Sequence, residues 1–295
     1  MIKDLGELKY FLGIEILRTD TNICLSQRKY VLELLSEYGL LACKPFKTPY
    51  ESKLVISNKP IDKNDKKIEN VTQYQKLLGK LIYLTHTRPD ISYSVHCLSQ
   101  YMHSPFESHL KIAFRVLRYL KDSPGKGILI SKSSNMDLKG YSDSDWAKCK
   151  ATRRSVTGFA VYMGDSLVSW KSKKQSVVSR SSAEAEYRAL ASLTCEVMWF
   201  QNLLRDLEVK VKVAVSLFCD NKVALQIASN LVFHERTKHF EIDLHFVRDK
   251  IIDGTIKPLK IESASQVTDI LTKGLSIDQH FKLVKSLRMF DLFKT

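Results

Sequence analysis

The chain has 295 residues, a length that suggests about two domains. Hydrophobic residues make up 44% of it and charged residues 26%, which excludes a mainly disordered chain. Lysine and arginine together number 46, against 32 aspartates and glutamates, so the formal net charge is +14. A surplus of this size indicates a polyanion such as nucleic acid as the partner, although a merely basic soluble protein fits the charge equally well.

The cysteines and the apolar runs of the chain indicate its cellular compartment. The six cysteines include no C-x-x-C pair, which leaves zinc ribbons and thioredoxin-like chemistry without support and favours free thiols in a reducing compartment. No apolar run approaches the roughly 18 residues of a membrane span, and the N-terminus carries charge where a signal peptide has its apolar core. We therefore expect a cytoplasmic or nuclear protein that is not secreted and has no membrane partner.

The first half of the chain predicts a hairpin followed by helices. Aromatic and branched residues on both sides of a turn at 19–22 predict the hairpin, and residues 27–41 then show helical periodicity. Prolines and charges make 41–70 a solvated loop. Three more helices are expected at 74–87, 90–102 and 108–122, and SPGKG at 123–127 marks a domain boundary.

The last of these helices carries a basic face. Lys111, Arg115 and Arg118 follow one another at i, i+4 and i+7 and therefore share one side of the helix. That side could lie along a phosphate backbone. An ordinary solvated face is the alternative.

The second half alternates strands and helices. Strands are expected at 138–143, 155–164 and 166–174, before a long helix at 181–207. A strand at 215–220 and a helix at 221–229 follow. The last three elements are a helix at 241–253, a strand at 256–262 and a helix at 266–275. Antiparallel strands that lead into parallel crossover units predict an α/β fold with a mixed sheet.

Acidic residues fall where this sheet would gather reactive groups. Asp143 closes the first strand and Asp220 closes the fourth, at the edge where such sheets bind ligands. In the long helix, Glu186 continues an apolar row and should face the sheet, whereas Glu184 should point nearer the outside. Asp269 lies in the final helix. Converging carboxylates favour Mg²⁺ or Mn²⁺, and two such ions about 4 Å apart can support phosphodiester cleavage.

Several segments together resemble a known family. GYSDSDWA, SRSSAEAEYRAL, FCDNKVALQIA and VTDILTKGL resemble, in order and spacing, the ribonuclease H domain of copia-type LTR retrotransposon polyproteins. Upstream, DLGELKYFLGIEI and the helical runs resemble the primer grip, thumb and connection of the reverse transcriptase of these polyproteins. The resemblance implies a ribonuclease H-like mixed five-stranded sheet with flanking helices at 137–290. It also implies a mostly helical reverse-transcriptase remnant with an N-terminal hairpin at 1–125.

The resemblance also implies an activity. Asp143, Glu186, Asp220 and Asp269 would be the catalytic residues and would hold two Mg²⁺ or Mn²⁺ ions in an endoribonuclease that cuts the RNA strand of RNA–DNA hybrids. Reverse transcriptases of this family carry a Tyr-x-Asp-Asp motif, and this chain has no Asp-Asp dipeptide. We therefore expect a truncated polyprotein without polymerase activity. The stretch before Asp269 also lacks the loop histidine found in many ribonucleases H.

A second basic cluster runs from the segment after the predicted helix at 221–229 into the predicted helix at 241–253, and it comprises His234, Arg236, Lys238, His239, His245 and Arg248. Arg236, Lys238, His239 and Arg248 are candidates for contact with the hybrid backbone. A zinc site, which no nearby cysteine supports, and a structural turn are the alternatives.

Two other functions compete with the nuclease. A catalytically silent retroelement fragment that only binds nucleic acid would keep the basic charge and would not cut. An integrase-type enzyme would need three acids in a different chain order. Metal-dependent cutting of a hybrid distinguishes the nuclease from the silent nucleic-acid-binding fragment. The oligomeric state is left open.

Overall fold

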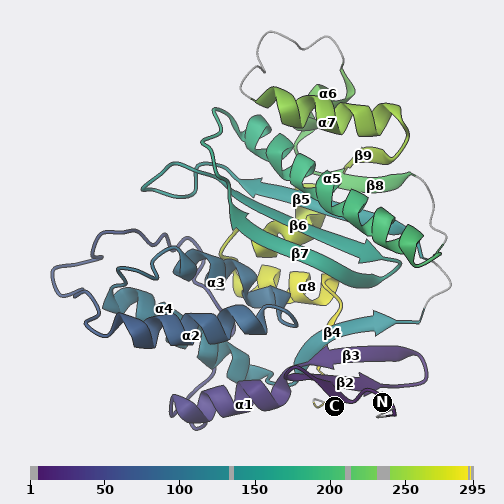
Figure 1. Ribbon diagram of the computed structural model, residues 1–295. Coiled ribbons are helices and arrows are strands. Elements are labelled where there is room, and N and C mark those ends of the chain that lie inside the picture. Colours follow the sequence, from purple (N-terminus) through teal and green to yellow (C-terminus); the bar gives the residue numbers. More distant parts are fainter. Residues whose placement is uncertain (1–5, 133–135, 210–213, 231–239, 292, 294–295) are drawn as a thin grey trace, which may run out of the picture. The chain divides into compact units, whose positions relative to one another are not determined.

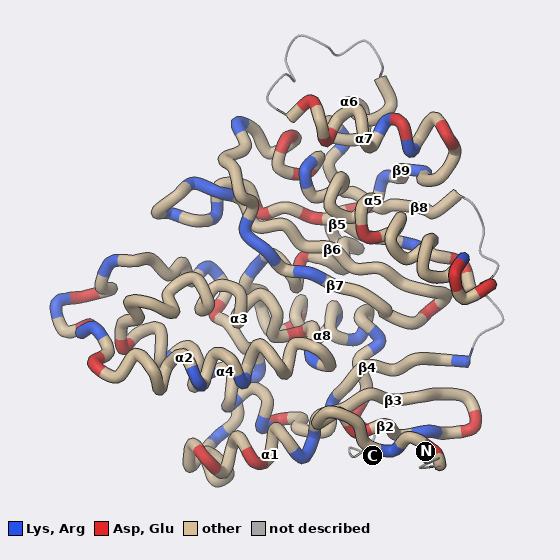
Figure 2. The backbone as a smooth tube through the Cα atoms, in the orientation of Figure 1, with Lys and Arg blue, Asp and Glu red and all other residues tan. Residues whose placement is uncertain are grey.

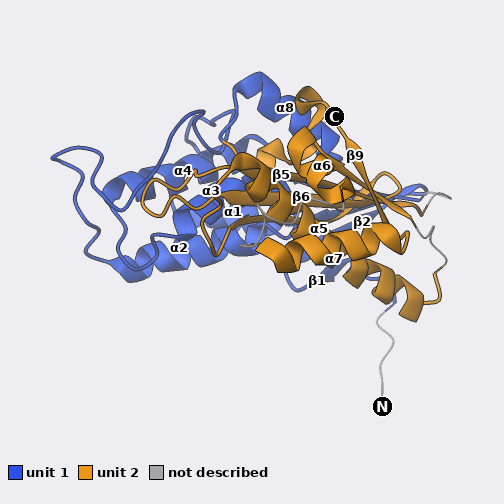
Figure 3. Cartoon of the chain, turned by 90° about the horizontal axis from the view of Figure 1, so that it is seen from above, with its two compact units in different colours: residues 1–132, 274–295 blue, residues 133–273 orange. Residues whose placement is uncertain are grey.

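The structure is a computed structural model that describes residues 6–132, 136–209, 214–230, 240–291 and 293. The chain forms two compact units: unit 1 comprises residues 1–132 and 274–295, and unit 2 comprises residues 133–273 (Figure 3). Over the residues described, no helix has the length and apolar character that a membrane crossing requires.

Unit 1 contains a five-stranded antiparallel sheet. Its strands, in spatial order, are β1 (Tyr10–Phe11), β2 (Ile14–Arg18), β3 (Asn22–Ser26), β4 (Lys126–Ser131) and β10 (Met289–Asp291). The hairpin of β2 and β3 is the one that the sequence predicts, with Leu17 opposite Cys24. The strands β4 and β10 were not predicted from the sequence, because both are held by partners far along the chain.

The helices of unit 1 follow their apolar rows. They are α1 (Arg28–Glu37), α2 (Val71–Leu84), η1 (Pro89–Ile91), α3 (Ser92–Ser99), α4 (Glu107–Asp122) and α8 (Ile277–Ser286). Leu77, Leu81 and Leu84 of α2 are fully buried, as helical spacing predicts for one face. The segment 41–70 forms no helix or strand beyond one bridge from Lys67 to Phe106.

The chain returns to unit 1 after Lys273, whereas the second domain was expected to continue to residue 290. Two contacts account for this return. Met289 of β10 pairs with Ile128 of β4. In α8, the Nε2 atom of His280 lies 2.9 Å from the hydroxyl of Tyr119 in α4. The apolar face of α8, with Leu283 and Val284, is buried with these contacts.

A buried ion pair lies beside this contact. The Nη2 atom of Arg88 is 2.8 Å from Asp90, and both side chains are almost fully buried. The Tyr119 hydroxyl donates a hydrogen bond of 2.6 Å to the same carboxylate. Burial alone would raise the pKa of Asp90, but the guanidinium of Arg88 outweighs it and lowers the pKa to about 2. The carboxylate is therefore ionised in the folded unit.

Unit 2 contains the mixed sheet that the sequence predicts (Figure 1). Its spatial order is β7 (Ser166–Lys174), β6 (Val156–Met163), β5 (Leu138–Asp145), β8 (Val215–Cys219) and β9 (Ile256–Lys260). The strands β5, β6 and β7 pair antiparallel, and β8 and β9 continue the sheet in parallel with β5. The carboxyl ends of β5 and β8 therefore meet at one edge of the sheet.

Helices cover one face of this sheet, and they are α5 (Ser182–Asp206), α6 (Lys222–Ser229) and α7 (Glu241–Ile252). Leu193 of α5 lies directly over Gly140 of β5. The core between them is apolar and includes Phe159, Leu190 and Leu217.

The other face of β5 and β6 is covered by η4 (Val267–Leu271). Here the expected helix at 266–275 is wrong in extent, because only five residues form a 3₁₀ turn, which starts after Gln266. Gln266 is buried and donates a hydrogen bond of 2.8 Å to the carbonyl of Ser142, which fixes the turn to β5.

Candidate active site

Asp143 and Glu186 reach one place from a strand and a helix. Asp143 lies on β5 and is 2% exposed, and Glu186 lies in the second turn of α5 and is 5% exposed. The Oε1 atom of Glu186 accepts a hydrogen bond of 3.1 Å from the backbone N–H of Ser144. Glu186 therefore faces the sheet, as its position in the apolar row predicts.

Asp220 comes to the same edge from the end of β8. The hydroxyl of Ser263 donates a hydrogen bond of 2.8 Å to its Oδ2 atom. The side chain of Lys260 donates to its backbone carbonyl. Because β8 is parallel to β5, the residue that follows β8 lies at the edge where β5 ends.

Asp269 enters from η4 together with a lysine. The Nζ atom of Lys273 lies 2.8 Å from Oδ1 of Asp269 and 3.5 Å from Oδ2 of Asp143. The hydroxyl of Thr272 also donates to Asp143. Lys273 and Thr272 were not predicted as site residues from the sequence. The spacing of four residues between Asp269 and Lys273, typical of a helical ion pair, is the signal that could have found the lysine.

The electrostatics show that negative charge is crowded at this edge. The pKa of Asp143 is raised to about 6, chiefly by burial and also by the charges of Asp269 and Asp220, whereas Lys273 lowers it. Burial also raises the pKa of Glu186 to about 9, with added repulsion from Asp143 and Asp220. The pKa of Asp269 is raised by burial as well. The raised pKa values mean that these carboxylates are costly to keep ionised, so a cation at this edge would stabilise them.

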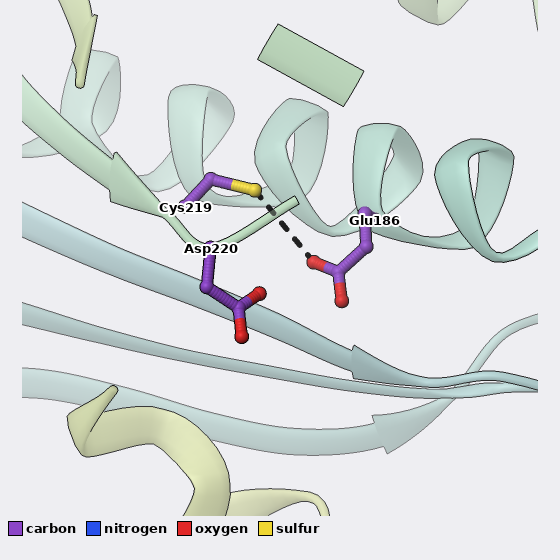
Figure 4. A group of neighbouring side chains, drawn as sticks. All are labelled: Glu186, Cys219 and Asp220. Carbon is purple, nitrogen blue, oxygen red and sulfur yellow. Dashed lines mark hydrogen bonds between the residues drawn. The ribbon is translucent and has the colours of Figure 1, made fainter. Parts of the chain in front are cut away.

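The donor set fits a hard divalent cation. Asp143, Glu186, Asp220 and Asp269 offer carboxylate oxygens, which are the ligands that Mg²⁺ and Mn²⁺ prefer. Glu186 and Asp220 are also grouped with Cys219, whose Sγ atom lies 3.8 Å from Oε2 of Glu186 (Figure 4). The raised pKa values give an independent reason why a cation would stabilise these oxygens.

The expectation that Glu184 points outward is wrong. Glu184 is 2% exposed, and its Oε1 atom lies 3.0 Å from Nη2 of Arg188. Its Oε2 atom accepts a hydrogen bond of 2.8 Å from the backbone N–H of Arg180. The hydroxyl of Ser181 caps the same helix end by accepting from the N–H of Glu184. Glu184 thus neutralises Arg188 and secures the start of α5.

The second basic cluster is described only in part. His234, Arg236, Lys238 and His239 lie outside the described residues. Arg248 is 3% exposed and donates to the carbonyls of Ile227 and Asn230, so it closes the end of α6 from within. A side chain so buried is not presented to a nucleic-acid backbone. His245 is exposed and lies 3.7 Å from Glu241.

The arginines of α4 bind the chain's own loop. Arg115 donates a hydrogen bond of 3.1 Å to the carbonyl of Thr48 and pairs with Glu51 at 2.8 Å. Arg118 donates to the carbonyl of Lys44. Both guanidinium groups also lie over the ring of Phe46. These contacts give the two arginines a structural role in unit 1, whereas Lys111 on the same face is exposed.

A basic cavity that the sequence analysis did not single out lies beside β7. It has a volume of about 340 Å³ and is lined by Lys171, Lys173, Lys174, Gln175, Arg188 and Asp243 among others. Figure 2 shows blue segments along β7. Arg188 is already paired with Glu184 and Asp243, so the lysines supply the positive charge. Because β7 is an edge strand, exposed lysines there also protect it from pairing with other chains.

Known proteins place the chain in a family. The Pol polyprotein of transposon RE1 from Arabidopsis thaliana is 42% identical over 275 residues, which are 93% of this chain and 18% of that protein. The Pol polyprotein of transposon TNT 1-94 from Nicotiana tabacum is 33% identical over 97% of this chain and 22% of its own length. The chain belongs to the Pol polyproteins of copia-type retrotransposons. No family model matches it.

This copia-type Pol chain spans about a fifth of the length of the curated relatives it matches. Among solved structures, the N-terminal ribonuclease H domain of a Mycobacterium tuberculosis protein aligns with 51% of the chain and 98% of its own length, at 13% identity and a TM-score of 0.36. LC11-RNase H1 in complex with an RNA/DNA hybrid aligns at 12% identity and a TM-score of 0.36. The expected mixed five-stranded sheet with flanking helices is confirmed, with the strands in the order β7, β6, β5, β8 and β9.

Proposed function

We propose that this copia-type Pol chain is a metal-dependent endoribonuclease that cleaves the RNA strand of RNA–DNA hybrids. One observation carries the proposal. Asp143, Glu186, Asp220 and Asp269 come from a strand, a helix, a strand end and a 3₁₀ turn, and their charges act on one another at one edge of the mixed sheet.

In this proposal the four carboxylates hold two Mg²⁺ or Mn²⁺ ions. Such ions supply Lewis acidity and lower the pKa of a bound water, which makes water the nucleophile. The chain's own contacts position the ligands. The N–H of Ser144 orients Glu186, and the hydroxyl of Ser263 orients Asp220. The hydroxyl of Thr272 does the same for Asp143.

The proposed nucleic-acid substrate is supported by the net charge of the chain and by lysines in the unit that holds the four acids. A net charge of +14 supports a polyanionic substrate. The lysines of the cavity beside β7 belong to the same unit as the four acids and can bind a phosphate backbone. Arg236, Lys238 and His239 remain proposed backbone contacts as well. A protein distinguishes the RNA strand from DNA by its 2′-hydroxyl groups.

Cleavage of a labelled RNA–DNA hybrid tests the function. We expect purified protein to cut with Mg²⁺ or Mn²⁺ and not with a chelator. Asp143→Asn should lose more than about a hundredfold in rate while keeping hybrid affinity. Asp165→Asn is the control, because Asp165 lies in the turn between β6 and β7 of the same unit and pairs with Lys139. Full activity of Asp143→Asn would show that the site is assigned wrongly.

A second candidate is a catalytically silent nucleic-acid-binding chain. The ammonium group of Lys273 favours it, because it pairs with the oxygens of Asp143 and Asp269 that an ion would need. Salt-sensitive hybrid binding without cutting in either metal would decide for this candidate. In both cases we propose no polymerase activity for these residues and a location in the cytoplasm or nucleus.

A further inference from the structure

A thiol lies among the proposed metal ligands. Glu186, Cys219 and Asp220 each offer one ligand atom, and these atoms all lie within 4.8 Å of one another. The side chains of Cys219 and Glu186 point toward each other from β8 and α5, as Figure 4 shows. The Sγ atom of Cys219 lies 3.8 Å from Oε2 of Glu186. Hard cations such as Mg²⁺ gain little from a sulfur ligand, so this donor set suits a different class of ion.

We propose that Glu186, Cys219 and Asp220 form a chelating site for a thiophilic divalent ion of the zinc and cadmium class. Zinc binds sulfur at about 2.3 Å and carboxylate oxygen at about 2.0 Å in tetrahedral geometry, which separates the two ligand atoms by about 3.5 Å. The separation of 3.8 Å between Sγ and Oε2 needs only a small adjustment to reach this value. On binding, the thiol releases its proton to the buffer as the metal–sulfur bond forms.

Neighbouring groups already hold the three ligands in place. The backbone N–H of Asn221 points at Sγ of Cys219 at 3.4 Å and can donate to a thiolate. Ser144 holds Oε1 of Glu186, which leaves Oε2 to face the sulfur. Ser263 holds Oδ2 of Asp220. Such supporting hydrogen bonds orient metal ligands and strengthen binding.

Burial makes the site selective for small species. Cys219 is fully buried and Asp220 is partly exposed, so an ion enters past Asp220. Cys195, in contrast, is exposed on α5, and it provides a thiol of the same chain outside the group. This inference goes beyond the proposed function, because a thiophilic ion bound by Glu186 and Asp220 would occupy carboxylate oxygens that the nuclease uses for Mg²⁺. Binding itself does not depend on whether the chain cuts hybrids.

Cadmium is the probe, because a cadmium–thiolate bond gives a charge-transfer absorption in the ultraviolet. The full chain is titrated with Cd²⁺ after removal of other metals. We expect the first equivalent to produce the band in the wild type and in Cys195→Ser, and no band from that equivalent in Cys219→Ser. A band of unchanged size in Cys219→Ser, or none in the wild type, would overturn the proposal. Circular dichroism verifies that each variant is folded.

The carboxylate variants distinguish a chelate from a lone thiol. Glu186→Gln and Asp220→Asn keep Cys219, so the band should persist while the affinity for Cd²⁺ falls at least about tenfold. Unchanged affinity in both variants would mean that the thiol binds alone, and the site would be refuted. The readout is optical, so a chain that fails to cut hybrids can still confirm this site, and a chain that cuts can still refute it.

Discussion

The ammonium group of Lys273 lies 2.8 Å from the carboxylate of Asp269, which precedes it by four residues. The same group lies 3.5 Å from the carboxylate of Asp143. An internal cation therefore lies between two of the four acids that we assign to metal binding. A lysine and a divalent ion that use the same oxygens compete. Lys273 therefore stabilises the metal-free chain and must move away from these oxygens when both acids bind an ion.

Lys273→Met should raise the affinity for divalent ions about tenfold, equivalent to about 1.4 kcal/mol, because the competing charge is removed. The same change should lower the free energy of unfolding in chelator, since Asp143 and Asp269 lose their counter-charge. Calorimetric titration with Mn²⁺ and urea unfolding in chelator measure the two effects. Lys257→Met, at an exposed position on β9, is the control. Equal Mn²⁺ affinity in Lys273→Met and wild type would contradict the competition.

Gly158→Ala should disturb the site from the neighbouring strand. Gly158 on β6 is the register partner of Asp143, and an added Cβ would lie 2.6 Å from Cγ2 of Thr272 and 3.0 Å from Cβ of Leu271. The segment that supplies Thr272 and Lys273 must then shift. We expect a loss of about 1–3 kcal/mol in the free energy of unfolding, as for other overpacked cores, and a loss of hybrid cleavage.

Gly79→Ala is the matched control for this change. Gly79 lies inside α2, and a Cβ there meets nothing within 4 Å. Alanine in a helix interior is favoured over glycine by about 1 kcal/mol, so stability should hold or rise. If Gly158→Ala behaved like Gly79→Ala in unfolding and in cleavage, the close approach of η4 to β6 would have no bearing on the site.

The lysines beside β7 should contribute salt-dependent affinity. Each phosphate contact adds about 0.9 to the slope of log K against log salt on a duplex. Lys171→Gln combined with Lys173→Gln should therefore flatten the slope by up to about 2 and weaken hybrid binding at low salt. Fluorescence anisotropy over a salt series measures the slope. Lys63→Gln, in the exposed loop of unit 1, should leave it unchanged. A slope that stays the same in the double variant would exclude this cavity from the interface.

Arg248→Met should affect folding and not binding. The guanidinium of Arg248 donates to the carbonyls of Ile227 and Asn230, and it is buried. Its removal takes a donor from these part-buried carbonyls, and we expect a total loss of about 1–3 kcal/mol in the free energy of unfolding. Urea unfolding should show this loss, while hybrid affinity per folded molecule and the salt slope stay as in the wild type. A reduced salt slope in the variant would instead support the prediction from the sequence that Arg248 contacts nucleic acid.

The sequence predicts the elements of unit 2 well because their periodicities are strong. Glu186 could be oriented from its place in the apolar row of α5, since helix geometry alone fixes which side faces the sheet. The place of Asp220 after β8 follows from the alternation of strand and helix, whereas β5 continues two residues past Asp143, where the sequence predicted its end. The mixed sheet itself follows from the order of these elements.

Long-range contacts set the limits of such prediction. The strands β4 and β10 exist because residues more than a hundred positions apart pair. The buried state of Arg248 could not be foreseen, because charged residues are rarely buried without a partner and the partners of Arg248 lie in another element. Lys273 was missed because its second contact, with Asp143, joins residues far apart in the sequence.

His280 should make a contribution to the stability of the folded chain that is lost on acidification. Burial lowers the pKa of His280 to about 4, against about 6.5 for an unfolded histidine. The unfolded chain therefore binds a proton first, so the stabilisation from neutral His280 is fully present above pH 6.5. It is lost as the pH falls from about 6.5 to about 4, by up to about 3 kcal/mol. Urea unfolding of the wild type and of His280→Gln at pH 7.5 and 4.5 measures the loss as the difference between the two proteins, because Asp143 and Glu186, with raised pKa values, act in the opposite direction in both. His280→Gln keeps an N–H that can donate to Tyr119 and removes the titration, so at pH 4.5 it should gain stability relative to the wild type. An equal pH dependence in both proteins would mean that folding does not shift the pKa of His280.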